Sequence, residues 1–134
     1  MFDPASFVKA AAFAAIYAGI EARYVNRMDA EWTRKMEGFF EKPAVWKVSP
    51  YQLYLLFPLF VVAASAPSAG AWAGNVLLIM LLEDALYFVW RRRWVEKGEW
   101  TTTLMGSFSV GGRTVPVWWI PAALGAAALY LLPA

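Results

Sequence analysis

The sequence contains no cysteine and no histidine, which excludes several kinds of chemistry at the outset. Without cysteine there is no disulfide and no thiolate nucleophile. Without histidine there is no imidazole ligand for zinc or haem and no histidine-based catalytic triad. Any bound metal must therefore be held by oxygen ligands.

Charged residues are also scarce, at 16% of the chain, against about a quarter in soluble domains. The formal net charge of +2 is small and confined to a few segments, so no nucleic-acid partner is expected. In contrast, 60% of the residues are hydrophobic and the mean hydropathy is +0.46. This excess indicates a single integral membrane domain, residues 1–134, of the all-α class.

Four apolar runs are long enough to cross the ~30 Å hydrocarbon layer as helices, for which ~20 residues are needed. The first run begins with Asp3 as a helix cap and Pro4 at the first helical position, so we expect a retained helix rather than a cleaved signal peptide. Together the runs predict an antiparallel four-helix bundle with spans over residues 4–23, 50–66, 69–90 and 115–132.

Two details of these runs predict local geometry. Pro58 lies in the middle of the second run, where it removes a backbone hydrogen bond and should kink the helix. Only Pro67 and Ser68 separate the second run from the third. These two spans should therefore form a tight antiparallel hairpin.

Orientation follows from the basic residues, because loops rich in Lys and Arg stay in the cytoplasm. Every basic residue except Lys9 lies in the loop after the first run or the loop after the third. We therefore expect a multi-pass protein of the cell membrane with both termini outside and both charged loops in the cytoplasm. An aromatic belt at the cytoplasmic rim would consist of Tyr51, Tyr54, Tyr87, Trp90, Trp94, Trp118 and Trp119.

Two further elements are expected in the cytoplasmic loops. Residues 25–42 carry apolar side chains at three- and four-residue spacing, which predicts an amphipathic helix lying on the membrane or reaching a partner helix. Residues 98–114 place Gly111 and Gly112 between two alternating runs, which predicts a small β-hairpin. The hairpin could be a plain connector or a lid over a site.

Small residues recur where helices could approach each other closely. Ala10, Ala14, Ala18 and Ala22 form a stripe in the first run, and Gly70 and Gly74 form a GxxxG pattern in the third. Such stripes serve either packing within the chain or contact between subunits. A homo-oligomer or a membrane-protein partner therefore remains open.

The third run carries two acidic residues, Glu83 and Asp84, about 10 Å below the basic rim at 1.5 Å per residue. A charge at such depth costs about 2.5 to 3.5 kcal/mol on insertion scales, so it needs a partner, a water-filled cavity or a proton. The two side chains should flank one inward-facing groove, with Tyr87 one turn beyond Glu83. Asn75 is expected to form a hydrogen bond between helices.

Glu21, near the end of the first span, could complete a three-carboxylate site with Glu83 and Asp84. Such oxygen ligands suit Mg²⁺ or Mn²⁺, and arginines suit a phosphate headgroup. Alternatively, an arginine neutralises Glu83 or Asp84, and the basic residues only fix topology. The candidate headgroup-binding residues are Arg23, Arg27, Arg91, Arg92 and Arg93.

Residues 83–89, EDALYFV, followed by Trp94 and later by Pro116 and Trp118, resemble an uncharacterised group of small prokaryotic polytopic membrane proteins. Those proteins carry an intramembrane acidic pair before an aromatic span end. That group follows the aromatics with Asn-Pro and a later histidine, whereas this chain continues with Trp90-Arg91 and lacks histidine. The resemblance implies a polytopic membrane protein and no particular reaction.

Three functions fit the sequence. The first is a cytoplasm-facing carboxylate site that binds a divalent cation and a phosphorylated lipid headgroup, which needs convergence of the three carboxylates. The second is a proton- or cation-coupled carrier working as an oligomer, which needs a polar path to the outer face. The third is a structural or accessory subunit of a membrane complex. It would have arginine-paired acidic residues and exposed small-residue stripes.

Overall fold

The computed structural model describes residues 1–25 and 52–133. The predicted amphipathic helix lies outside this part except for its first residue, and Arg27 and the first two residues of the second predicted span lie outside it altogether. The described chain is mostly helical, with one two-stranded sheet. Its elements are α1 (Pro4–Ile20), η1 (Glu21–Val25), η2 (Gln52–Leu56), α3 (Phe57–Ala63), α4 (Ala69–Trp90), α5 (Trp100–Thr103), β1 (Ser107–Val110), β2 (Arg113–Pro116) and α6 (Trp119–Leu131).

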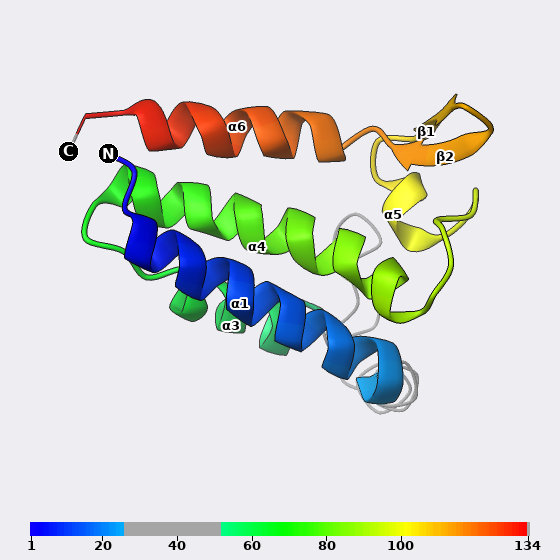
Figure 1. Cartoon of the computed structure of the whole chain (residues 1–134), viewed down its shortest axis with the longest axis horizontal. Coiled ribbons are helices and arrows are strands. Elements are labelled where there is room, and N and C mark those ends of the chain that lie inside the picture. Colours follow the sequence, from blue (N-terminus) through cyan, green and yellow to red (C-terminus); the bar gives the residue numbers. More distant parts are fainter. Residues whose placement is uncertain (26–51, 134) are drawn as a thin grey trace, which may run out of the picture.

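Helix α4 occupies the centre, packed between α1 and α6 (Figure 1). The chain runs in the same direction along α1 and α4 and returns along α3 and α6. Both termini therefore lie at one end of the helices, beside the turn from α3 to α4. The other end carries η1, the last turn of α4, α5 and the hairpin, and with them Arg23, Arg91, Arg92, Arg93 and Arg113. We call this the basic end and the opposite one the terminal end.

Local signals place the helix starts where the sequence predicts them. The Asp3 carboxylate accepts a hydrogen bond from the backbone N–H of Ser6 at 2.8 Å, and Pro4 is the first residue of α1. Ser68 caps α4 in the same way, accepting from the N–H of Ala71 at 3.2 Å. The tight turn between α3 and α4 is confirmed, although α3 ends at Ala63, three residues before the predicted end.

The second predicted span is not one continuous α-helix. Its described part begins as the wider π-helical turn η2 and becomes α-helical at Phe57, with Pro58 in the first turn of α3. Proline has no N–H to continue an i→i−4 ladder from the preceding turn, so the change of helix type falls at this residue. The kink expected at Pro58 stays a prediction, and the structure has here a change from π-helical to α-helical winding at Phe57.

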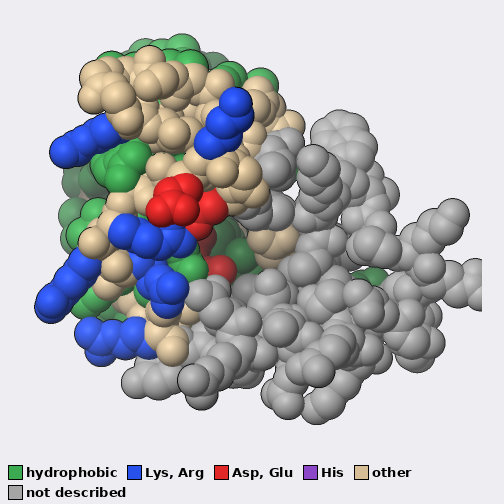
Figure 2. All heavy atoms as spheres, turned by 90° about the vertical axis from the view of Figure 1, so that its right-hand side faces the viewer, with side chains coloured by type: hydrophobic (Ala, Val, Ile, Leu, Met, Phe, Trp, Pro, Cys, Tyr) green, Lys and Arg blue, Asp and Glu red, His purple; other side chains and the backbone are tan. Residues whose placement is uncertain are grey.

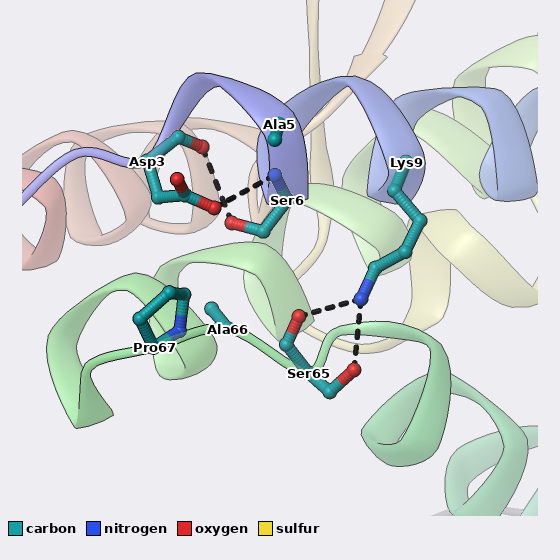
Figure 3. A pocket seen from close by; sticks show the side chains of 7 residues that line it. All are labelled: Asp3, Ala5, Ser6, Lys9, Ser65, Ala66 and Pro67. Carbon is teal, nitrogen blue, oxygen red and sulfur yellow. Dashed lines mark hydrogen bonds between the residues drawn. The ribbon is translucent and has the colours of Figure 1, made fainter.

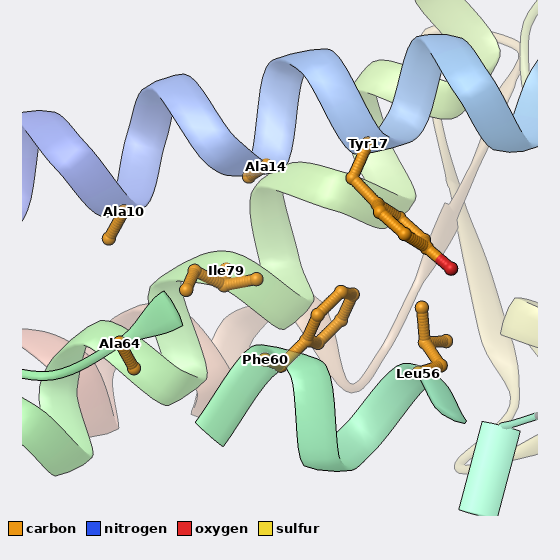
Figure 4. Close-up of a cluster of buried hydrophobic side chains, with 7 residues drawn as sticks. All are labelled: Ala10, Ala14, Tyr17, Leu56, Phe60, Ala64 and Ile79. Atoms are coloured by element: carbon orange, nitrogen blue, oxygen red, sulfur yellow. The ribbon is translucent and has the colours of Figure 1, made fainter. Parts of the chain in front are cut away.

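Alanines let α1 approach its neighbours. Ala10, Ala14 and Ala18 have no exposed surface. Figure 4 shows Ala10 and Ala14 facing the inner side of the bundle, where Ile79 of α4 and Phe60 of α3 fill the space. The alanine stripe therefore packs within the chain.

Glycines allow a similarly close approach between α4 and α6. A Cβ atom on Gly70 would lie 2.9 Å from the carbonyl oxygen of Leu129, and one on Gly74 would lie 2.8 Å from the ring of Tyr130. Asn75, fully buried, accepts from the Tyr130 hydroxyl at 2.8 Å and donates to the carbonyl of Ala64 at 3.1 Å. The predicted interhelical hydrogen bond of Asn75 is confirmed, and its two bonds join α4 to the end of α3 and to α6.

The predicted hairpin is also confirmed. β1 and β2 pair antiparallel, with Val110 opposite Arg113, and Gly111 and Gly112 form the turn with φ of 56° and 78°. Both values lie in the left-handed region that glycine adopts without strain. The expected start of the fourth span at residue 115 is wrong, because β2 extends to Pro116 and α6 begins only at Trp119.

Two helices are long and apolar enough to cross a membrane by length and composition, Pro4–Arg23 and Ala69–Trp90. The other two apolar helices of the described chain, Tyr54–Ala63 and Trp119–Leu131, are shorter than a full span. The described part thus supports a helical protein with two candidate membrane helices. It does not confirm the four-span bundle.

The packing at Gly74 yields a first prediction. Gly74→Val places a branched side chain against the Tyr130 ring, so we expect a loss of about 1–3 kcal/mol in stability and a lower thermal unfolding midpoint by circular dichroism in detergent. Ala127→Val, at an exposed position of α6, introduces the same residue without this contact. Equal midpoints for the two variants would contradict the close approach of α4 and α6.

Candidate functional site

Two of the predicted carboxyl groups meet at the basic end of the bundle. Glu21 begins η1, and Glu83 lies in α4 with only 7% of its surface exposed. Glu21 is the side chain that acts most strongly on the Glu83 carboxyl group, so the two face each other between η1 and α4. Oε2 of Glu21 is buried, and no N–H or O–H group of the described residues donates to it. The structure therefore places carboxyl against carboxyl between α1 and α4.

Asp84 faces a different set of neighbours. Its Oδ2 atom accepts a hydrogen bond from the Thr101 hydroxyl at 2.6 Å and another from the indole N–H of Trp119 at 2.7 Å. The Thr101 hydroxyl in turn accepts from the indole N–H of Trp118 at 2.8 Å. Asp84 is thus held by donors from α5 and from the start of α6.

The acidic pair therefore divides between two sides of α4. Adjacent residues of a helix differ by about 100° in direction, so Glu83 reaches toward η1 while Asp84 reaches toward α5 and α6. That both flank one groove stays a prediction, since the Glu21 charge acts on Glu83 and on Asp84 alike. Tyr87, one turn from Glu83, packs edge-on against Phe88, with ring centroids 5.2 Å apart.

No sequence pattern identifies Thr101 and Trp119 as partners of Asp84, or Trp118 as the partner of Thr101. Thr101 has 2% of its surface exposed and Trp118 has 8%, so both are buried. Their donors need acceptors inside the protein, because an unpaired buried donor is costly. Neither the burial of these side chains nor the choice of Asp84 as the acceptor could be read from the sequence.

The arginines of the basic end are engaged elsewhere. Arg93 forms a bidentate ion pair with Glu99, at 2.5 and 3.0 Å. Arg91 donates to the carbonyl of Ala22 at 3.2 Å, and the Arg23 guanidinium lies 5.4 Å from the ring centre of Trp90. Within residues 1–25 and 52–133, no ion pair joins an arginine to Glu21, Glu83 or Asp84.

Arg92 differs from its neighbours. It is exposed, and its φ of 55° makes it the single non-glycine residue of the described chain with positive φ. Figure 2 shows this end of the molecule: acidic side chains gather in a hollow near its centre, with Lys and Arg side chains around them. Charge of both signs is therefore concentrated here, with Glu83 buried, Asp84 half-buried, and Arg92 and Glu96 exposed.

The predicted Mg²⁺ or Mn²⁺ site has no support from this geometry. Among the described residues, no group of three or more Asp or Glu side chains is arranged to hold a metal ion. The division of Glu83 and Asp84 between two sides of α4 accounts for this.

No protein-family model, curated protein or solved structure matches this chain. The resemblance carried by residues 83–89 stays a prediction. Function has to be inferred from the side chains themselves.

Removing the Thr101 hydroxyl should destabilise the fold. Thr101→Val keeps the shape of the side chain but deprives Asp84 of a donor and Trp118 of its acceptor, which should cost about 1–3 kcal/mol. Thermal unfolding in detergent, compared with the control Thr114→Val in β2, measures the effect. An unfolding midpoint for Thr101→Val equal to that of the control would argue against the network.

The Arg93–Glu99 pair predicts a pH dependence. Burial acts to raise the pKa of Glu99, but the Arg93 guanidinium and the backbone N–H of Glu96 outweigh it and lower that pKa below its ordinary 4.5. The pair therefore contributes stability above about pH 4.5, and this contribution disappears as the pH falls through the lower folded pKa.

The measurement is the thermal unfolding midpoint of the native chain and of Glu99→Gln between pH 7 and pH 3. We expect the native chain to be the more stable above pH 5 and the difference to shrink as the pH falls through the folded pKa. A difference that does not change with pH would show that Glu99 acts through packing and not through its charge.

Proposed function

We propose that this chain is a four-span membrane protein whose Glu21 and Glu83 hold a proton between them, in a site that exchanges with the cytoplasm. The observation that carries the proposal is the contact between these two carboxyl groups. Ionised carboxylates are acceptors only and repel each other at close range, so a proton shared between the two groups would stabilise the pair. No arginine of the described residues supplies the positive charge instead.

Exposure along the helices supports the membrane setting. Only 33% of each long apolar helix is buried, whereas the core helix of a soluble protein is mostly buried. Large apolar side chains face outward on α1, α3, α4 and α6. Examples are Val8 and Ile16 on α1, Val62 on α3, Val89 on α4 and Leu124 on α6. Exposed apolar surfaces of this kind are typical of membrane or protein interaction sites, and we take lipid as the partner here.

The direction of the helices supports the four-span topology. The chain runs toward the basic end in α1 and α4 and away from it in α3 and α6, as four successive crossings require. The basic end also carries all the described arginines, which favours the cytoplasmic side for it. The short lengths of α3 and α6 leave η2 and the β-hairpin at the level of the headgroups.

The arginine rim would hold the basic end against the anionic cytoplasmic leaflet. Each basic residue near such a surface contributes about 1 kcal/mol of attraction. Arg92, exposed and without a side-chain partner among the described residues, is the best candidate for a lipid phosphate. The proposed lipid contact thus belongs to the rim and is separate from the carboxyl pair.

An accessory subunit fits the geometry less well. That function predicts exposed small-residue stripes, but Ala10, Ala14, Ala18 and Gly74 are buried inside the chain. It also predicts acidic residues neutralised by arginine, and the described residues contain no such pair at Glu83 or Asp84.

Infrared difference spectroscopy of the protein in nanodiscs tests the proposal. Near neutral pH we expect the C=O stretch of a protonated carboxyl group, present in the native chain and lost in both Glu83→Gln and Glu21→Gln. The control Glu96→Gln changes an exposed carboxylate of the same end and should leave the band intact. Absence of the band from the native chain would overturn the shared proton.

Calorimetric titration with Mn²⁺ and Mg²⁺ addresses the alternative occupant. Saturable binding that is lost in Glu83→Gln would mean that a metal ion, and not a proton, neutralises the pair. No saturable binding is expected, because two carboxyl groups provide too few oxygen ligands for either ion.

A further inference from the structure

The terminal end contains a cavity that the carboxyl site does not involve. It has a volume of about 440 Å³, within the range of roughly 300–1,000 Å³ usual for ligand pockets. Figure 3 shows that one wall comes from the start of α1 and the other from the turn between α3 and α4. Charged and polar groups of the first wall are Asp3, Ser6 and Lys9, and the second wall provides Ser65, Ala66 and Pro67.

The two charges of this cavity have opposite sign and different positions along α1. Lys9 donates to the carbonyl oxygen of Ser65 at 2.6 Å and to its hydroxyl at 2.8 Å, which leaves one of its three donors for a ligand. Asp3 is ionised, because hydrogen bonds from Ser6 hold the pKa of its carboxyl below the ordinary value. The step of six positions from Asp3 to Lys9 corresponds to about 9 Å along the helix.

Among the described residues, Lys9 is also the one basic side chain at the terminal end. An ammonium group inside a membrane span is costly, and such residues commonly mark a site for a ligand or ion. The described residues offer it no carboxylate ion pair. The ammonium group therefore lies beside the cavity without a carboxylate partner among the described residues.

We propose that this cavity binds the phosphoethanolamine headgroup of an outer-leaflet phospholipid, with the phosphate at Lys9 and the ammonium at Asp3. The order of charges matches the ligand: in the lipid the phosphate is bonded to glycerol, and the ammonium lies two carbons farther out. Lys9 is the deeper of the two residues and Asp3 the one nearer the surface. The inference shares with the proposed function only the membrane-spanning topology.

The test uses the full chain in a neutral detergent and short-chain lipids below their micellar concentration. Dihexanoyl phosphatidylethanolamine should shift the backbone amide resonances of Ser6, Ser65 and Ala66 in a saturable way. Dihexanoyl phosphatidylglycerol carries the phosphate without the ammonium. It should bind about tenfold more weakly, as expected for the loss of one charge-assisted hydrogen bond.

Two variants separate the charges. Asp3→Asn keeps a good helix cap but removes the negative charge, so it should abolish the preference between the two lipids. Lys9→Met removes the positive charge and should weaken both by about tenfold. Lys97→Met, an exposed lysine at the basic end, should change neither.

Equal affinity of the native chain for the two lipids would overturn the inference, as would shifts confined to residues outside the cavity. Free phosphoethanolamine that binds as tightly as the lipid would point to a soluble ligand and would also overturn it. If Lys9→Met does not fold, the selectivity of Asp3→Asn decides the question. None of these readouts depends on a proton at Glu83, so the two proposals can fail separately.

Discussion

Helix α4 buries polar side chains along its length, and the need to pair each of them inside the protein determines how the other elements sit around it. A polar group away from water costs free energy unless a partner replaces the lost hydration. Asn75 finds its partners in Ala64 and in Tyr130 of α6. Glu83 meets Glu21 of η1, and Asp84 accepts from Thr101 and Trp119. Helix α6 is consequently fixed to α4 at both of its ends.

Tryptophan side chains support this arrangement by donating to backbone carbonyls. The indole N–H of Trp90 reaches Ala15 across to α1, that of Trp72 reaches Val61, and that of Trp94 reaches Thr114 of the hairpin, at 2.6 to 2.9 Å. Gly19 leaves room for the Trp90 side chain, since a Cβ atom at this position would lie 2.9 Å from the indole ring. The aromatic belt at the headgroups stays a prediction, and Trp118 is buried in the protein.

The parts of the fold that could be predicted are those governed by neighbouring residues. Asp3 and Ser68 cap helices that begin beside them, and Gly111 and Gly112 turn a hairpin between adjacent strands. From the sequence, a Glu21–Glu83 contact was one of two alternatives, the other being an arginine partner for the acidic pair. The choice depends on how α1 packs on α4. The partners of Asp84 could not be predicted at all, since Thr101 and Trp119 approach it only after α5 and α6 fold back over α4. The start of α6 was misplaced for a similar reason: Val115 and Pro116 are apolar enough for a span but are held by pairing with β1.

The packing of α4 also bears on whether the carboxyl pair belongs to a site open to one side or to a polar path through the membrane. A coupled carrier needs polar groups from the basic end to the terminal end. Between Glu83 and Asn75, one turn from each, lies Ile79, which is fully buried against Ala10, Ala14 and Phe60. Asn75 itself has its amide and its carbonyl oxygen engaged by Ala64 and Tyr130. A proton that enters at the carboxyl pair thus meets an apolar layer within one helical turn. Within a single described chain, this favours a site that opens to one side over a path through the membrane.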